Sequence, residues 1–390
     1  MNIVDLVVLV VVALAAVQGL RLGAIVQVLT YGGFWIGLWL GALLASVTVR
    51  WSHAQSARTT LALVTMLGVA VLCGVAGRIG GNVVFVRVHR GFVGSVDSVL
   101  GLVVAVVATL LVAWLLASTL ANTSSLTLNS SIANSRILRS IDGVLPPPPS
   151  VFSRVQNFLS SEGFPPVFAQ IAPITAGPVA LPGDAQLQQA VDHAGASTVK
   201  IIGDGCGDIQ EGSGFVVAPG VVVTNAHVIA GIANPVVEDG FGSHATTVVS
   251  FDPSYDLAVL RVNDLSEPAL PLDASTVSRG TQAAVLGYPG GGPFDVVPAG
   301  VMDEFQAQGR DIYGQGLTER EVYELQAVVR PGNSGGPLVE PDGEVIGVVF
   351  SRSTTNNNVG YALTSPGVLA EVQRAKTLTA TVGTGPCTSN

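Results

Sequence analysis

Long apolar stretches without charge occupy the first third of the chain. Residues 22–49, 59–77 and 98–121 contain no Asp, Glu, Lys or Arg, and each is long enough to cross a lipid bilayer as a helix. A shorter apolar segment, at about 3–20, begins beside Asp5. A signal sequence is the alternative there, but the segment has no positive start and three more follow it. The pattern predicts four transmembrane helices over residues 1–121, because buried helices of soluble proteins rarely lack charge over such lengths.

Two features within these segments bear on how the helices pack. Glycines cluster on the third segment, at Gly74, Gly77, Gly80 and Gly81, and small residues let helix backbones approach closely. Asp97 stands at the head of the fourth segment, where we expect a polar helix-start residue. A transport or export channel is disfavoured, because charged residues that would line a pathway are nearly absent.

The next segment has the composition of a tether. Residues 122–135 are rich in Ser, Thr and Asn, and Pro146–Pro149 predict a rigid, extended stretch. Short amphipathic helices are expected at Arg136–Val144 and Val151–Ser161. The chain is then interrupted by Pro165, Pro166, Pro173, Pro178 and Pro182. We expect residues 122–183 to be a linker that is open to proteolytic cleavage.

From Ala196 the pattern changes to short β-rich runs separated by Gly, Asn and Asp. Such runs at this spacing predict an all-β barrel or sandwich in a domain of residues 184–390. The expected strands are Thr198–Ile202, Ser213–Val217, Val221–Thr224, Thr246–Phe251, Leu257–Val262, Ala283–Gly287, Glu324–Val329, Glu344–Phe350 and Val359–Leu363. A closing helix is expected at Val368–Thr377. The segment Phe294–Val322 is rich in Gly, Asp and Glu, so we expect a mobile loop there.

Composition and charge support a membrane part joined to an exposed part. Apolar residues make up 48% of the chain and charged residues only 12%. Residues 1–121 hold six arginines against two aspartates, a net charge of +4; since the whole chain carries −9, the rest carries −13. An acidic domain lacks the basic face that phosphate binding needs, so no nucleic acid partner is expected. The arginines flank the predicted helices four against four, so the positive-inside rule does not fix the orientation.

The cysteines bear on the compartment. Cys73 lies inside the third apolar segment and is interpreted as a small buried residue. If Cys206 and Cys387 pair, the bridge closes about 180 residues, and a structural disulfide indicates an oxidising compartment. The alternative is two unpaired thiols. We expect the β domain to lie outside the cytoplasm.

Three short motifs carry the candidate chemistry. Ser334 lies in the hexapeptide Gly332–Pro337, where glycines allow backbone N–H groups to converge on one spot. Upstream, His227 follows the run Val221–Thr224, and Asp256 precedes Leu257–Val262. His227 is the candidate general base for Ser334, and Asp256 is the candidate that orients the histidine. The chain order His, Asp, Ser is that of the chymotrypsin-type double β-barrel.

With these residues in place, residues 196–370 resemble a bacterial trypsin-like serine protease of the HtrA type. The motifs are Gly212–Phe215, Thr224–Val228, Tyr255–Leu260 and Gly332–Pro337. The resemblance implies two six-stranded barrels with the triad in the cleft between them. It also implies an oxyanion hole at Gly332, Asn333 and Ser334.

The front of the chain resembles the colicin V production (CvpA) membrane family, on its four spans and on the pattern Arg90-Gly91, Asp97 and Gly101. Together the two parts resemble actinobacterial membrane-anchored periplasmic serine proteases of the acid-resistance (MarP) type. That family implies a multi-pass protein of the plasma membrane, with a periplasmic endopeptidase domain that cuts protein or peptide substrates in envelope stress.

The same resemblance places the specificity pocket. Its base is expected near Val328, six residues before Ser334, which disfavours cleavage after Lys or Arg. Phe350, Ser351 and Arg352 are expected to form the edge that pairs with the substrate backbone. Asn333 replaces the aspartate that pairs with a newly cut N-terminus in digestive relatives, so the site is expected to form without such a cut.

Other classes of function remain as alternatives. A catalytically idle membrane scaffold or receptor on a protease fold is one; it predicts a folded protein whose serine is unreactive. The chain has no room for the peptide-binding domain that follows the protease in HtrA proteins, so the protease domain is expected to be monomeric. No cofactor is expected, and His53, His89, His193 and His244 lack the spacing of metal ligands.

Overall fold

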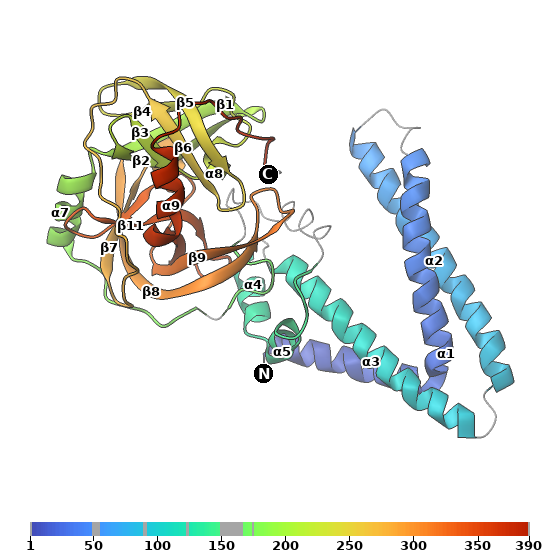
Figure 1. Ribbon diagram of the computed structural model, residues 1–390. Coiled ribbons are helices and arrows are strands. Elements are labelled where there is room, and N and C mark those ends of the chain that lie inside the picture. Colours follow the sequence, from blue (N-terminus) through green and yellow to red (C-terminus); the bar gives the residue numbers. More distant parts are fainter. Residues whose placement is uncertain are drawn as a thin grey trace. The chain divides into compact units, whose positions relative to one another are not determined.

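The computed structural model describes residues 2–48, 55–88, 92–121, 125–148, 167–173 and 175–388 (Figure 1). The chain forms two compact units. One comprises Met1–Leu115 with Arg136–Ile141, and the other comprises Leu116–Ser135 with Asp142–Asn390.

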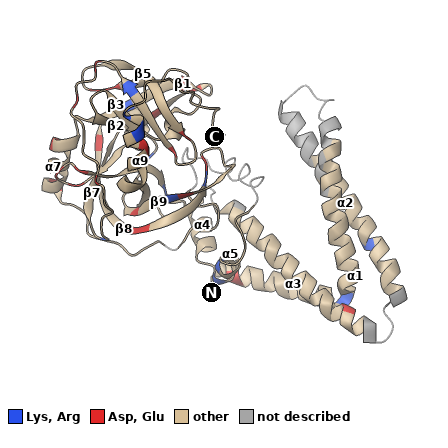
Figure 2. Ribbon diagram, viewed as in Figure 1, with Lys and Arg blue, Asp and Glu red and all other residues tan. Residues whose placement is uncertain are grey.

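The first unit is built from long apolar helices, α1 (Ile3–Thr48), α2 (Gln55–Val88) and α3 (Phe92–Leu120). Three stretches among the described residues are long and apolar enough to cross a membrane: Ile3–Gly41, Leu67–Val86 and Gly94–Ser118. Figure 2 shows how few charged residues these helices carry. The sequence pattern predicted four separate helices, and the first two are joined in α1.

The joint within α1 is a kink at Gly23. This residue has φ +73° and ψ 166°, a backbone conformation that interrupts the helix and that glycine adopts readily. The carboxylate of Asp97 accepts a hydrogen bond from the N–H of Ile25 at 3.0 Å. Asp97 therefore satisfies the start of the second half of α1, whereas the sequence pattern had assigned it to the start of its own helix, α3. The side chain of Gln27 adds a bond to the carbonyl of Gly101, at 2.8 Å.

The predicted helix–helix contact through glycines is confirmed for three of the four residues; a Cβ atom added at Gly74 would lie 3.5 Å from Cβ of Phe34, and the approach is tighter at the next two. A Cβ atom added at Gly77 would lie 2.1 Å from the carbonyl oxygen of Leu29, and one at Gly81 would lie 2.8 Å from Cα of Val26. A Cβ at Gly80 would meet nothing within 4 Å. Helices α1 and α2 therefore touch along one glycine face of α2.

The predicted tether contains a helix that its composition did not reveal. Helix α4 (Leu126–Ala133) begins at Ser125, whose side chain accepts a hydrogen bond from the N–H of Leu128. The predicted helix at Arg136–Val144 is observed as α5 (Arg136–Asp142). Several sequence features lie outside the described residues: Arg50, His53, His89, Arg90, Gly91, Pro149, the predicted helix Val151–Ser161, Pro165 and Pro166.

The β domain folds as two closed barrels of six strands each, preceded by helix α7 (Asp184–Ala194). The first barrel has the order β1-β2-β3-β6-β5-β4 and the second β10-β11-β12-β9-β8-β7. The first comprises β1 (Thr198–Gly205), β2 (Asp208–Ala218), β3 (Val221–Thr224), β4 (Val236–Glu238), β5 (Ser243–Asp252) and β6 (Leu257–Val262). The second comprises β7 (Gln282–Gly287), β8 (Asp295–Arg310), β9 (Leu317–Gln326), β10 (Pro337–Val339), β11 (Val345–Arg352) and β12 (Val359–Thr364).

Short helices α8 (Ala226–Ile229), η2 (Pro289–Gly291) and α9 (Ser365–Ala375) complete the domain, and α9 matches the predicted closing helix. Each barrel has its own apolar interior, and a third cluster joins the two barrels. That cluster holds Phe215 and Val223 of the first barrel with Leu286, Val348 and Phe350 of the second. Burial of these side chains fixes one barrel against the other.

The prediction of a mobile loop over Phe294–Val322 was wrong. Strands β8 and β9 pair without interruption from Gly300 opposite Gln326 to Arg310 opposite Leu317, apart from one bulge near Val301. The charged residues that suggested a loop alternate with buried ones such as Ala307 and Val322. Since successive side chains of a strand point to opposite faces, charges such as Asp303 and Glu319 are exposed on the hairpin, whereas Arg310, Arg320 and Glu324 are buried.

Candidate active site

The first barrel brings the histidine and the aspartate together. His227 lies in α8, directly after β3, and Asp256 lies directly before β6. The two carboxylate oxygens of Asp256 accept separate bonds from His227: one from its backbone N–H at 2.9 Å and one at ring Nδ1, 2.8 Å away. A proton held at Nδ1 leaves Nε2 free to act as a base toward the cleft.

Asp256 is held in a conformation that is costly for a residue with a side chain. Its φ is +62°, in the left-handed region, and it is fully buried. The side-chain amide of Asn225 donates to its carbonyl oxygen at 2.8 Å. Strain of this kind persists only where the surroundings enforce it. Here the enforced turn presents both carboxylate oxygens to His227.

A buried arginine interacts electrostatically with the aspartate of this pair. Arg320 of β9 is 1% exposed, donates from Nε to the carbonyl of Ser254 at 2.9 Å and from Nη2 to the carbonyl of Arg310 at 2.9 Å. Burial lowers the pKa of the Arg320 guanidinium, and the negative charge of Asp256 opposes that shift. The sequence analysis did not identify Arg320, because this residue lies in the segment Phe294–Val322, which was expected to be a loop.

The second barrel supplies the serine. Ser334 lies in the turn before β10, and it lines the same cleft, of about 520 Å³, as His227 and Gly332. The tip of the β1–β2 hairpin, from Cys206 to Glu211, forms another wall of the cleft. No hydrogen bond joins Nε2 of His227 to Oγ of Ser334 in the described residues, and such bonds are often long in enzymes without substrate.

Two backbone N–H groups beside the serine are left without partners. The carbonyl of Pro331 accepts a bond from Gly290 N–H at 2.7 Å, and the carbonyl of Asn333 accepts one from Gly336 N–H at 3.0 Å. In a trans peptide the N–H points opposite to the carbonyl. The N–H groups of Gly332 and Ser334 therefore point away from those partners, and neither donates a bond within the described part of the chain. Such a pair suits a developing oxyanion.

The backbone of Ser213 holds this turn from the other barrel. Its N–H donates to the carbonyl of Ser334 at 2.8 Å, and its own carbonyl accepts a bond from Thr224 Oγ1 at 2.8 Å. Gly335 has φ +82°, and a Cβ there would lie 2.2 Å from the carbonyl oxygen of Ser213. The glycine after the serine is thus needed for this close approach.

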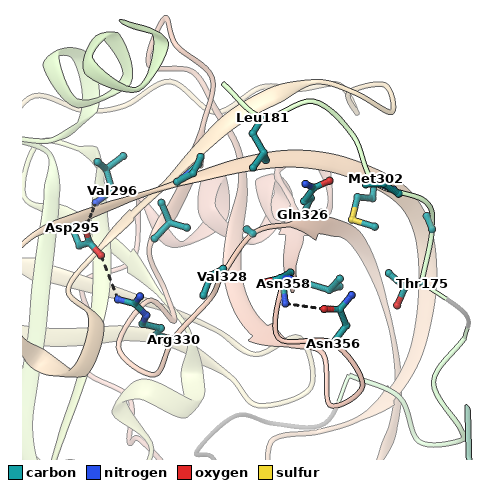
Figure 3. Close-up of a pocket in the computed structure, with 16 residues that line it drawn as sticks. Thr175, Leu181, Asp295, Val296, Met302, Gln326, Val328, Arg330, Asn356 and Asn358 are labelled. Carbon is teal, nitrogen blue, oxygen red and sulfur yellow. Dashed lines mark hydrogen bonds and ion pairs between the residues drawn. The ribbon is translucent and has the colours of Figure 1, made fainter. Parts of the chain in front are cut away.

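The four candidate specificity residues do not share one cavity. Val328 lines a pocket of about 730 Å³ with Arg330, Asp295, Thr175 and Leu181 (Figure 3). Phe350 is fully buried in the cluster between the barrels, and the adjacent Ser351 is 1% exposed. Arg352 ends β11. The roles of all four in substrate selection stay predictions.

Cys206 and Cys387 form a disulfide, as the pairing hypothesis required. Cys206 has a positive φ of +61° at the tip of the β1–β2 hairpin, and both Cys206 and Thr388 line the cleft that holds His227 and Ser334. The bridge therefore fixes the C-terminal segment at the rim of the site. Among the described residues, no group of three or more His, Cys, Asp or Glu is arranged to hold a metal ion.

Comparison with known proteins extends these observations to the whole chain. Residues 4–146 match the family model of the colicin V production protein, and residues 212–348 match that of the trypsin-like peptidase domain. Serine protease Rv3671c of Mycobacterium tuberculosis is 36% identical over 391 residues, which cover 99% of this chain and 98% of that protein. Mitochondrial serine protease HTRA2 of Bos taurus is 37% identical over 164 residues, covering 40% of this chain and 34% of that protein. The crystal structure of the active form of the Rv3671c protease matches with a TM-score of 0.53 and 40% identity, over 56% of this chain and 96% of that one.

Proposed function

The chain belongs to the MarP-type serine proteases, in which a colicin V production domain precedes a trypsin-like peptidase domain, and we propose that it cuts peptide bonds through His227, Asp256 and Ser334. The observation that carries this assignment is the pairing of Asp256 with both the ring and the backbone of His227. The nucleophile and the two free N–H groups lie across the same cleft.

The reaction follows from the positions of these groups. Nε2 of His227 takes the proton of Ser334 Oγ as the oxygen attacks the carbonyl carbon of the substrate. The resulting oxyanion accepts bonds from the N–H groups of Gly332 and Ser334. His227 then gives its proton to the leaving amine, and water hydrolyses the acyl-enzyme by the same route in reverse. Asp256 stays ionised throughout and stabilises the imidazolium.

Asn333 supports a site that needs no newly cut N-terminus. Its side-chain oxygen accepts a bond from the N–H of Arg330 at 2.9 Å, which closes the turn before Ser334 from within. In this chain a hydrogen bond to the neutral side chain of Asn333 therefore takes the place of the ion pair that an aspartate forms with a newly cut N-terminus in digestive relatives. Any control of activity then acts through the loops around the turn.

The location of the enzyme is inferred from its other parts. The apolar helices and the match to a colicin V production domain support a membrane anchor, and the Cys206–Cys387 disulfide supports an oxidising compartment. We place the protease domain on the extracytoplasmic side, acting as a monomer on proteins or peptides of the envelope. A role in envelope stress or acid resistance is proposed from the family.

A fluorophosphonate probe tests the chemistry, since it reacts only with an activated serine. The full-length wild-type protein is expected to be labelled, and Ser334→Ala is expected to abolish labelling. Ser275→Ala, at an exposed serine of the same domain, is the matched control and should label like the wild type. A correctly folded wild-type protein that resists the probe would instead support the idle-scaffold alternative.

A further inference from the structure

The side chain of Lys200 links the first barrel to the turn η2 of the second. Its Nζ donates to the carbonyl of Gly291 at 2.7 Å, and it lies 3.1 Å from Oε1 of Glu211 and 3.9 Å from Oε2 of Glu238. The Lys200 side chain is only 15% exposed. One ammonium held by two carboxylates of its own barrel is thus aimed at a backbone carbonyl of the other.

Turn η2 in turn holds the peptide that carries one of the two free N–H groups. The N–H of Gly290 donates to the carbonyl of Pro331 at 2.7 Å, and this carbonyl belongs to the same peptide as the N–H of Gly332. Contact between the two loops is close: a Cβ at Gly332 would lie 2.4 Å from the carbonyl oxygen of Tyr288 and 2.6 Å from the nitrogen of Gly290. The orientation of the Pro331–Gly332 peptide therefore depends on where η2 lies.

Covalent structure fixes η2 only at Pro289, whose ring sets its φ angle. Gly290 and Gly291 have φ +61° and +64°, and glycine passes between left- and right-handed conformations with little cost. Gly332, at φ +93°, is equally free to let its peptide turn over. If that peptide turned, its carbonyl would replace the N–H that faces the cleft. An external tie on η2 is needed to prevent this.

We propose that Lys200 is a positioning residue for the oxyanion hole: its ammonium fixes η2, and η2 holds the Pro331 carbonyl so that the Gly332 N–H faces the substrate. The proposal rests on the proposed function of Ser334 and adds a residue outside the triad. Glu211 strengthens the arrangement, because its carboxylate lies against the turn; a Cβ at Gly291 would be 1.7 Å from its Oε2.

The test compares three variants of the full-length protein in detergent or nanodiscs. Lys200→Met removes the donor, Lys200→Arg keeps a donor of the same charge, and Lys376→Met removes the same charge at a site far along the chain. Each is assayed for kcat and KM on a peptide substrate, normalised to active sites titrated with the fluorophosphonate at saturation. Binding of a peptide aldehyde, which forms a tetrahedral oxyanion adduct, is measured in parallel.

Lys200→Met is expected to lower kcat by about 10- to 100-fold, a smaller loss than the roughly 10²–10³ for removing an oxyanion donor outright. KM should change less than about twofold, and aldehyde affinity should fall with kcat, because both report the oxyanion interaction. Lys200→Arg should recover most of the activity, and Lys376→Met should match the wild type. A role in stability alone would reduce the number of active sites and leave kcat per site unchanged.

Gly291→Ala provides a second route to the same state, because its side chain would displace from the turn the Glu211 carboxylate that pairs with Lys200. It should reproduce the fall in kcat and aldehyde affinity. A folded Lys200→Met enzyme with wild-type kcat and aldehyde affinity would overturn the role of Lys200 while leaving the triad intact. Absence of probe labelling in the wild type would overturn both proposals.

Discussion

Ser213 Oγ donates to the carbonyl oxygen of Gly332 at 2.6 Å and accepts a bond from the N–H of Tyr288 at 2.9 Å. A hydroxyl of the first barrel therefore connects η2 to the turn Gly332–Gly336 that carries Ser334, here called the catalytic turn. Ser213 is fully buried, so both partners depend on it for a hydrogen bond.

Removal of this hydroxyl should impair both stability and turnover. Ser213→Ala leaves the buried carbonyl of Gly332 and the partly buried N–H of Tyr288 unpaired, which should cost about 1–3 kcal/mol in the free energy of unfolding. Because the freed groups adjoin the oxyanion hole, kcat should also fall, by about tenfold. Ser197→Ala is the matched control: its Oγ donates to the carbonyl of Pro268 at 2.6 Å, away from the catalytic turn. It should lose stability without losing kcat; equal kcat in the two variants would contradict the connection.

A buried carboxyl should make the β domain more stable in mild acid than its acidic composition suggests. Burial raises the pKa of Glu324, whose Oε2 accepts a bond from the N–H of Ala176 at 2.9 Å. A pKa above its unfolded value means that the folded state binds the proton more tightly. The stabilising effect is complete below the unfolded pKa, near 4.3, and is lost as pH rises through the folded pKa.

The variant Glu324→Gln removes this titration while keeping an oxygen acceptor. At neutral pH it should melt at a higher temperature than the wild type, and the difference should vanish toward pH 4. Glu319→Gln, at an exposed position of the same strand, should show no such trend.

Other carboxyl groups of the β domain are shifted as well. Burial raises the pKa values of Glu267, Glu304 and Glu340. Desolvation also acts on Asp239 and Glu371, but the hydrogen bonds that they accept outweigh it and lower their pKa values.

The disulfide should be detectable in native membranes by thiol labelling. Cys206 and Cys387 are expected to resist a membrane-impermeant maleimide until a reductant is added. The bond joins residues 181 positions apart, for which chain entropy gives a stabilisation of about 5 kcal/mol as an upper figure. The Cys206→Ala, Cys387→Ala double variant should therefore unfold at lower denaturant concentration. Free thiols reached only from the cytoplasmic side would contradict the extracytoplasmic placement.

The membrane unit offers a matched pair of glycines. Gly77→Leu should separate α1 from α2, because its first side-chain atom would overlap the carbonyl of Leu29. Gly80→Leu, one turn along the same helix, meets open space and should be tolerated. Thermal aggregation of the purified protein in detergent measures the difference. A variant at Gly77 as stable as the one at Gly80 would show that the helices do not pack on this face.

The proposed triad could be predicted from the sequence because each of its residues stands beside a strand with a recognisable local pattern. His227 follows a β-branched run, Asp256 precedes another, and Ser334 sits among glycines. The contributions of Lys200, Ser213 Oγ and Arg320 could not be found this way, since each acts on a residue more than 60 positions away. Only the closed barrels bring those groups together.

Two errors in the predicted fold have a common cause. The hairpin of β8 and β9 was taken for a loop, and α1 was divided at Arg21. In both places charged or glycine residues were given more weight than the apolar positions around them. In the folded protein, tertiary contacts stabilise the elements in spite of these residues. Ala307 and Val322 are buried, and Asp97 accepts a hydrogen bond from the turn that follows Gly23.

The division of the site between two barrels has a consequence for biosynthesis. A chain that emerges amino end first completes the barrel with His227 and Asp256 before the barrel with Ser334 exists. Lys200 and Ser213 lie in this first barrel, whereas η2 and the catalytic turn belong to the second. The proposed oxyanion site therefore forms only when the second barrel has closed and packed against the first. An unfinished chain therefore holds His227 and Asp256 in place without the serine or the two N–H groups that the proposed reaction needs.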